Sequence, residues 1–329
     1  MNKITCLILF FSFQFFAINT VHSNPQNTSN EEQVVVYGVR PGPELWRIKN
    51  GENELWILGT LSLLPKRMDW HSELVEAIIE ESQVLLLPPS ADADIGFFKS
   101  LSLVTSLIGI KKNPDGKKLK DVVPKEMYEK WLVLKKKYMG NDRGVEKTRP
   151  IFASQELFDK AIKKIGLVYD KKVTKKVKKI AKRNKLELIT PTVNLEFAQP
   201  KAAIKKFKKS DINDLNCFST TLQRLELDIE TMRLRANAWA DGDVLKIKEL
   251  EYPDQITACG YAFLNSDVVQ DTEMKDIVPR LKKAWLDAAQ EALDKNKSTF
   301  AILPMRDLIG QESFIQDLSA LGYKIKIPK

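Results

Sequence analysis

The stretch Leu55–Leu64, L-W-I-L-G-T-L-S-L-L, decides the fold of this chain. Its first four residues are continuously apolar, which is typical of a central strand buried on both faces. The turn Gly59-Thr60-Leu61-Ser62 follows and leads into a helix-forming region. Because α/β folds place their chemistry at the ends of strands, we expect this turn to mark a functional site.

The segments on either side of this stretch predict an α/β start. Leu45–Ile48 alternates as a strand, and Asn50-Gly51 is a strong hairpin signal before the apolar stretch. A helix is predicted over Asp69–Ser82, with one apolar face formed by Leu74, Val75 and Ile78. Val84–Leu87 is a second apolar strand. The order strand, strand, helix, strand is that of an α/β protein.

Helices dominate the middle of the chain, and the end returns to strands. We predict helices over residues 91–110, where the pattern is mixed, and over 124–138, 154–165, 213–237 and 276–296. A strand at 299–303, a helix at 312–321 and a strand at 323–327 close the chain. The expected fold is α/β, with a mixed central sheet built from N- and C-terminal strand–helix–strand segments and a large helical insert at about 124–296.

The composition fits a globular protein. The chain has 329 residues, of which 43% are hydrophobic and 29% charged, so it can bury a sizeable core. Its net charge of +9 favours acidic partners without specifying them. The sequence contains neither a P-loop nor a dinucleotide-binding fingerprint.

An export signal is predicted at the N-terminus. Lys3 precedes a long apolar run, Ile4–Val21, and Val21-His22-Ser23 has small or apolar residues where a signal peptidase reads. We predict cleavage after Ser23, a disordered tail at residues 24–33, and a mature domain at 34–329 in the periplasm or outside the cell. The alternative is an uncleaved membrane anchor, because the run is close to the length that spans a bilayer. After cleavage the protein is not expected to be an integral membrane protein.

Two cysteines remain after this cleavage, Cys217 and Cys259. An even pair in an exported chain predicts a disulfide. Closing a loop of about 43 residues would stabilise the fold by about 4 kcal/mol in the loop-entropy description. The alternative is two buried free thiols.

The most basic part of the chain is Lys160–Lys185, which holds twelve lysines and arginines and one acid. Four apolar residues lie at helical spacing beneath this charge, Val173, Val177, Ile180 and Ala181. The predicted basic face consists of Lys172, Lys175, Lys176, Lys179, Lys182 and Arg183. It is either the solvated side of an amphipathic helix or a contact surface for an acidic envelope component. Nucleic acid is not an expected partner, since an exported protein rarely meets it and stacking aromatics are scarce here.

Several segments together resemble the TraB/GumN family, which includes the Tiki metalloproteases. They are the hairpin L-W-R-I…L-W-I-L-G-T, the strand V-L-L-L, the segment R-P-I-F-A-S, the turn A-W-A-D-G-D at Ala238–Asp243, and the closing L-G-Y-K-I. The resemblance covers nearly all of the mature chain, and the order of the segments is more specific than any one of them. It implies an α/β fold and, in the Tiki branch, a metal-dependent peptidase.

The resemblance also implies site residues that this chain lacks. Family members typically carry G-T-x-H after the first buried strand, G-x-x-H after the late strand, and a glutamate after the strand that follows the first helix. Such residues are thought to hold a divalent ion with an open position for water. The corresponding positions here are Gly59-Thr60-Leu61-Ser62, Leu303-Pro304-Met305-Arg306 and Pro88. Serine, arginine and proline therefore stand where histidine, histidine and glutamate are expected.

The histidine count supports the loss of this site. The chain has two histidines, His22 and His71, and His22 leaves with the predicted signal peptide. One histidine cannot build a two-histidine metal site, so we expect neither a metal nor another cofactor. His71 lies at a predicted helix start, where a surface or capping role is expected.

Three other arrangements stay open. Ser62 could act as a nucleophile with His71 as its base, although nothing resembles G-x-S-x-G. Asp241, Asp243 and Asp254 could hold a metal, but they do not form a calcium-loop pattern. Ser62 and Arg306 could instead line an anion-binding pocket.

We therefore expect an exported, catalytically inactive TraB/GumN-like protein that binds an unidentified ligand or partner through the cleft or the basic face. The first alternative is a Tiki-like metal-dependent hydrolase with substituted site residues. The second is a structural envelope protein held by an uncleaved anchor. Metal content separates the first two hypotheses, and cell fractionation tests the third.

Overall fold

The computed structural model describes residues 42–93, 103, 105–169, 171–196, 199–210, 212–250, 255–270, 272, 274–310 and 312–328. All of them belong to one unit, Arg40–Lys329. The predicted signal peptide and tail lie outside the described residues. None of the helices in this described part combines the length and the apolar character that crossing a bilayer requires.

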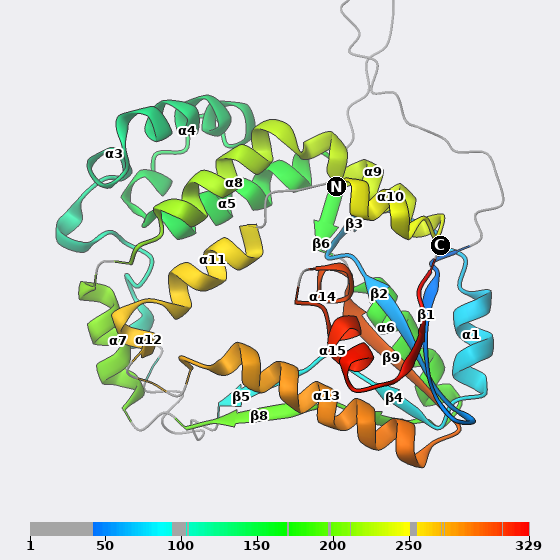
Figure 1. The fold of residues 1–329 in the computed structure, drawn as a ribbon. Coiled ribbons are helices and arrows are strands. Elements are labelled where there is room, and N and C mark those ends of the chain that lie inside the picture. Colours follow the sequence, from blue (N-terminus) through cyan, green and yellow to red (C-terminus); the bar gives the residue numbers. More distant parts are fainter. Residues whose placement is uncertain are drawn as a thin grey trace, which may run out of the picture. The chain divides into compact units, whose positions relative to one another are not determined.

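A mixed sheet of six strands forms the core, in the order β10-β1-β2-β9-β4-β7 (Figure 1). The strands are β1 Leu45–Asn50, β2 Asn53–Thr60, β4 Val84–Leu86, β7 Glu187–Ile189, β9 Ser298–Pro304 and β10 Lys324–Lys326. β2, β9, β4 and β7 run parallel, whereas β1 is antiparallel to both β2 and β10. The predicted mixed sheet with strands from both ends of the chain is therefore confirmed.

The predicted hairpin has a two-residue loop. Asn50 pairs with Asn53, and Gly51 has a φ of +60° at the first central position of the turn. A glycine adopts this left-handed conformation without steric cost, which explains the strong turn signal.

Helices cover the two faces of the sheet. α1 Glu73–Glu80 packs against α6 Lys172–Arg183, and α13 Ile277–Lys295 packs against β1, β2, β4 and β9. Figure 1 shows α13 and α15 Phe314–Ala320 in front of the strands and α6 behind them. α14 Met305–Ile309 directly follows β9 and packs against it and β2.

The middle of the chain is mostly helical and has its own apolar core around Trp131, Phe158 and Phe218. Its helices are α3 Leu119–Val122, α4 Lys125–Tyr138, α5 Pro150–Lys164, α7 Pro200–Lys209, α8 Leu215–Leu227, α9 Ile229–Ala240, α10 Val244–Glu249, α11 Gln255–Leu264 and α12 Asp267–Gln270. Two small sheets join this region to the rest. They pair β3 Leu63–Pro65 with β6 Leu167–Tyr169, and β5 Ser90–Ala93 with β8 Thr192–Leu195.

Four details of the predicted elements are wrong. The helix predicted over Asp69–Ser82 is only α1, and Leu74 is exposed because the buried face centres on Val75, Ile78 and Ile79. The helix predicted from residue 154 begins at Pro150, whose fixed φ suits a first turn. The mixed helix predicted from residue 91 begins instead as strand β5, and most of residues 94–104 lie outside the described part.

The fourth correction concerns the long helix predicted over 213–237. It is interrupted at Asp228, which ends α8 and precedes α9. The carboxylate of Asp228 accepts hydrogen bonds from Arg224 and Arg235, on the two helices. Aspartate is a weak helix former, which favours a break at this position.

Candidate functional site

The predicted functional site lies where β2 and β9 end side by side. In this parallel pair Gly59 is the neighbour of Leu303, and Thr60 is the neighbour of Pro304. The Thr60 hydroxyl donates a hydrogen bond to the Leu303 carbonyl at 3.3 Å. The sheet register therefore brings both halves of the expected family motif to one edge.

The A-W-A-D-G-D turn fixes this edge from the helical side. The buried indole Nε1 of Trp239 donates a hydrogen bond to the Gly59 carbonyl at 2.6 Å. Gly59 is closely packed, because a Cβ there would lie 2.8 Å from the end of the Met305 side chain and 3.0 Å from the Trp46 ring, so these side chains would have to shift. Close packing thus explains the glycine and the tryptophan without any catalytic role.

A cavity of about 360 Å³ opens beyond these strand ends. Its walls come from the β2–β3 connection, the start of α14, and helices α8 and α9. The described residues that line it are Thr60, Leu61, Ser62, Leu63, Arg224, Met232, Arg235, Pro304, Met305 and Arg306. Three of these lining residues are arginines, and none of the lining residues is acidic.

Two of the arginines are held in place from behind. Arg224 Nε lies 3.3 Å and Arg235 Nη2 lies 2.5 Å from Asp228 Oδ2. The exposed fraction of the side chain is 7% for Arg224, 5% for Arg235 and 3% for Asp228. Arg235 also donates to the Leu250 carbonyl, and Arg224 lies over the Phe158 ring. One carboxylate therefore orients two guanidinium groups.

The third arginine is more accessible. The side chain of Arg306 is 41% exposed, and its Nε lies 3.2 Å from Asp307 on the same helix. Its two terminal nitrogens have no partner among the described residues. Arg306 can therefore present its planar fork to a bound anion.

A second cavity of about 170 Å³ adjoins the first. Ser62, Leu63 and Arg224 line both, and the second is completed by Gln155, Phe158, Tyr169 and Cys259. The Tyr169 hydroxyl donates to Asp159 at 3.0 Å and accepts from Gln155 at 2.9 Å. Burial, and then the charge of Asp159, raise the pKa of Tyr169 to about 12.

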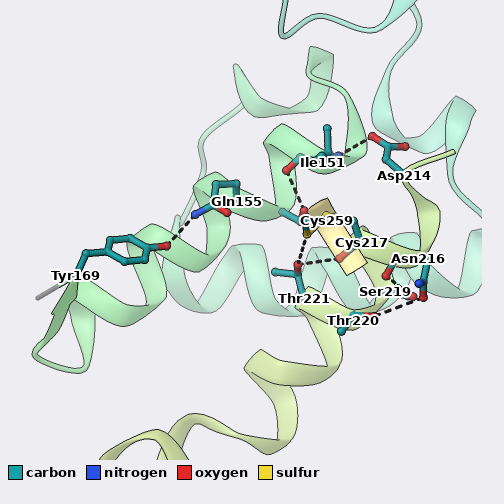
Figure 2. The surroundings of a disulfide bond; sticks show 11 residues. Ile151, Gln155, Tyr169, Asp214, Asn216, Cys217, Ser219, Thr220, Thr221 and Cys259 are labelled. Atoms are coloured by element: carbon teal, nitrogen blue, oxygen red, sulfur yellow. Dashed lines mark hydrogen bonds between the residues drawn. A yellow bond between two sulfur atoms is a disulfide. The ribbon is translucent and has the colours of Figure 1, made fainter. Parts of the chain in front are cut away.

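The predicted disulfide borders the second cavity. Cys217 of α8 and Cys259 of α11 are bonded to each other, which confirms the predicted pair. Figure 2 shows Thr221 beside the bond, and Tyr169 joined to Gln155 by a hydrogen bond. One buried face of α8 carries Cys217, Thr221 and Arg224 at helical spacing, and Asp228 follows at the end of the helix.

The structure brings most of the predicted motif positions together, but not all. Ser62, Thr60 and Arg306 line the same cavity. Leu303 is buried beside Gly59 in the sheet and does not line the cavity. Pro88 follows β4 and is not among the residues that line this cavity.

The residues in this cavity do not fit a divalent cation. Its polar walls offer guanidinium groups and hydroxyls, and guanidinium groups repel a metal ion. Within the described residues, no group of three His, Cys, Asp or Glu side chains is placed to hold a metal.

The other candidate residues lie apart from the cavity. The side chain of His71 is 47% exposed, its Nδ1 lies 3.6 Å from Glu73, and no hydrogen bond links it to Ser62 among the described residues. Asp243 caps α10 by accepting a hydrogen bond from the Lys246 backbone at 2.7 Å. Asp254 lies outside the described residues.

The predicted basic face is on α6, above the expected buried residues Val173, Val177, Ile180 and Ala181. Part of its charge is paired, since Lys176 lies 3.5 Å from Glu76, and Arg183 lies 3.8 Å from the same carboxylate. The hydrogen bond from Ser72, and then the charges of these two cations, hold the pKa of Glu76 below its usual value against the opposing effect of burial.

Another part of this face is open to solvent. Lys175, Lys179 and Lys182 are exposed at helical spacing, and they have no partner among the described residues. Lys172, in contrast, donates to the Lys66 carbonyl at 2.7 Å.

Four residues that line the two cavities were not predicted from the sequence: Arg224, Arg235, Gln155 and Tyr169. One signal was available. Arg224 lies seven residues after Cys217 and four before Asp228, so it shares the face of a helix that is otherwise apolar. A charged residue on a buried face, with an opposite charge one turn away, indicates a buried ion pair.

Comparison with known proteins agrees with this architecture. Residues 44–327 match the TraB/PrgY/gumN family, a span that contains every strand of the central sheet and both cavities. Searches among curated proteins and among solved structures found no match. Since the family match covers most of the chain, the protein belongs to the TraB/PrgY/gumN family.

Proposed function

We propose that this protein is an exported member of its family that binds an anionic ligand at the ends of β2 and β9, and that it is catalytically inactive. The observation that carries the proposal is the composition of the cavity wall, which contains Arg224, Arg235 and Arg306. This cavity lies at the strand ends where the family resemblance implies a metal site. Guanidinium groups are the side chains best suited to bind carboxylate or phosphate.

The substitutions support inactivity as a proposal. Ser62 and Arg306 stand where the family resemblance expects histidines, and Pro88 stands where it expects a glutamate. A site that binds an anion and a site that binds a metal need opposite charge on their walls. The positively charged arginines of this cavity favour a site that binds an anion.

Export is supported by the N-terminal sequence and by the disulfide. A disulfide persists in oxidising compartments such as the periplasm, and the bond between Cys217 and Cys259 is consistent with that location. Cleavage after Ser23 can be tested by sequencing the N-terminus of the secreted protein, and retention in the membrane fraction would favour the anchor.

A second candidate function is contact with an acidic envelope surface through α6. It is favoured by the exposed row Lys175, Lys179 and Lys182. Charge reversal of this row should abolish sedimentation with anionic vesicles and leave anion binding in the cavity unchanged.

Two measurements test the main proposal. Titration calorimetry with inorganic phosphate, sulfate and acetate should detect binding by the intact mature protein, and Arg306→Gln should weaken it. The matched control is Arg233→Gln, an exposed arginine of α9 that pairs with Glu230 away from the cavity. Absence of binding by all three anions would overturn the proposal.

Elemental mass spectrometry after mild dialysis tests the metal-dependent alternative. A Tiki-like hydrolase must retain about one divalent ion per chain. A stoichiometric transition metal would overturn the proposed inactivity, whereas a metal-free protein that binds anions would support it.

A further inference from the structure

One face of the sheet carries four cations at its β10 edge. β10 is the last strand in the order of the sheet, and its register with β1 places Lys326 opposite Arg47. Two residues earlier in β10, Lys324 lies opposite Lys49. Directly opposite residues of an antiparallel pair point to the same face, and like charges in that position destabilise the pair. We call these four residues the basic edge.

The packing of Ile325 directs both lysines of β10 to this face. Ile325 lies opposite buried Ile48 and packs against the main apolar core. Because side chains alternate along a strand, Lys324 and Lys326 point to the other face. A register shift of one residue would turn both lysines toward the core, so the core fixes the position of the basic edge.

One carboxylate pairs with the basic edge. Glu54 of β2 accepts a hydrogen bond from Arg47 Nε at 2.9 Å and lies 3.1 Å from Lys49 Nζ. Lys324 and Lys326 are exposed, and neither has a hydrogen-bond or ion-pair partner among the described residues. The two cations of the outermost strand are therefore available to an acidic partner.

The basic edge is built from other residues than the cavity of the proposed function. It borders a cavity of about 170 Å³. The described residues that line this cavity are Arg47, Lys49, Lys324, Ile325 and Lys326, and none of them lines the cavity at the ends of β2 and β9.

The outer edge of β10 offers backbone groups as well as charge. Within the described part of the chain, no strand pairs with β10 on the side away from β1. Such an edge can take an extended segment as an additional strand, with affinity from main-chain hydrogen bonds and specificity from alternate side chains. Side chains on one face of a strand are about 7 Å apart, so acids at alternate positions of an added strand can lie beside Lys324 and Lys326.

The lysines also restrict which strand can pair with this edge. A second copy of β10 would place lysine against lysine, and lysines on edge strands commonly prevent such pairing. A strand with acidic residues at these positions forms two opposite-charge pairs instead.

We infer that β10 is a docking edge for an extended acidic segment of another protein, with two acidic residues separated by one residue. The segment adds as a strand outside β10, and its two carboxylates lie beside Lys324 and Lys326. This inference is independent of the proposed anion-binding function.

Ligand-observed NMR on the full mature chain at low ionic strength tests the inference with capped pentapeptides. Thr-Glu-Val-Glu-Thr carries its acids at alternate positions, and Thr-Glu-Glu-Val-Thr has the same composition and charge. We expect the first peptide to bind about fivefold more tightly, because only its carboxylates share one face of an extended strand. Methylation of its three central backbone nitrogens should abolish binding, because it removes the main-chain donors and keeps the charge.

Two double variants locate the binding. Lys324→Gln/Lys326→Gln should reduce the ratio of the two peptide affinities to near one. Lys117→Gln/Lys120→Gln is the matched control, since it removes the same charge from exposed lysines of the helical region, and it should leave the ratio unchanged. All four lysines are exposed, and a melting curve of each variant confirms folding.

Several results would overturn the inference. Equal binding of the two isomers, or undiminished binding of the methylated peptide, would mean that the face attracts charge without adding a strand. Tripolyphosphate that binds more tightly than the alternating peptide, and loses binding in Lys324→Gln/Lys326→Gln, would assign the basic edge to a polyphosphate anion. Absence of peptide binding would leave the lysines with only the role of preventing edge pairing. Because anion binding in the cavity is measured separately, each of these results leaves the proposed function standing.

Discussion

Asp228 is expected to be the most sensitive polar residue of the site. Its Oδ2 lies 3.3 Å from Arg224 Nε and 2.5 Å from Arg235 Nη2, and all three side chains are almost fully buried. Asp228→Asn keeps the size of the side chain but removes the negative charge that two buried guanidinium groups share. Removing one partner of a buried ion pair costs about 3–5 kcal/mol, and we expect Asp228→Asn to lower the free energy of unfolding by that amount.

Urea denaturation at pH 7 measures this change. With a slope of about 1–3 kcal/mol per molar urea, the midpoint should fall by at least about 1 M. Glu230→Gln is the matched control, because Glu230 pairs with Arg233 at 3.5 Å but is 69% exposed. That surface pair is expected to contribute less than about 1 kcal/mol.

The same variant connects stability to the proposed ligand. An anion bound on the cavity side of the arginines supplies negative charge that Asp228→Asn has lost, so added phosphate should raise the urea midpoint of Asp228→Asn more than that of the wild type. Ionic strength is kept equal with sodium chloride. A loss below about 1 kcal/mol in Asp228→Asn, similar to that of a surface pair, would refute the view that Asp228 holds the two arginines.

The remaining predictions concern the disulfide, the lost motif and one titrating group. Reduction of the Cys217–Cys259 bond should lower the free energy of unfolding by about 4 kcal/mol, and an unchanged melt with both thiols open to alkylation would contradict this. The double variant Ser62→His/Arg306→His should show no peptidase activity, because the glutamate position after β4 is still a proline; clear activity on a peptide panel would mean that the site is misplaced. The pKa of Tyr169 is raised from 10.0 to about 12 in the folded protein, so its stabilising contribution is complete below pH 10 and is lost as the pH rises to about 12. Wild type should therefore lose stability relative to Tyr169→Phe across that window in paired denaturation curves, and parallel curves would contradict the assignment.

Patterns of neighbouring residues in the sequence predicted the strand and turn that lead to the site. The apolar run of β2 and the turn signal at Gly51 depend on neighbours in the sequence, and the structure confirms both. The cysteine pair was predicted from its even number and the expected export, which needed no knowledge of the fold. The buried side of α6 followed from helical spacing alone.

Local patterns could not predict the arginine wall. Arg224 and Arg235 lie on two different helices, and the cavity that they line is completed by residues from β2, β3 and α14, which are distant in the sequence. The strand β7 was missed for a similar reason. It has three residues, too few to show a period, and it joins the sheet because β4 offers a free parallel edge.

The contacts that hold the strand ends in place differ from the side chains that give the cavity its charge. The strand ends are fixed by the Trp239 hydrogen bond to Gly59, by the Thr60 hydrogen bond to Leu303, and by the close packing of Gly59 on α14. None of these contacts uses the side chains of Ser62 or Arg306, so those two positions can change without disturbing the sheet. The family match therefore accounts for the strand ends at this edge, whereas the charge of the cavity depends on the side chains that line it, and the described lining residues include three arginines and no acid.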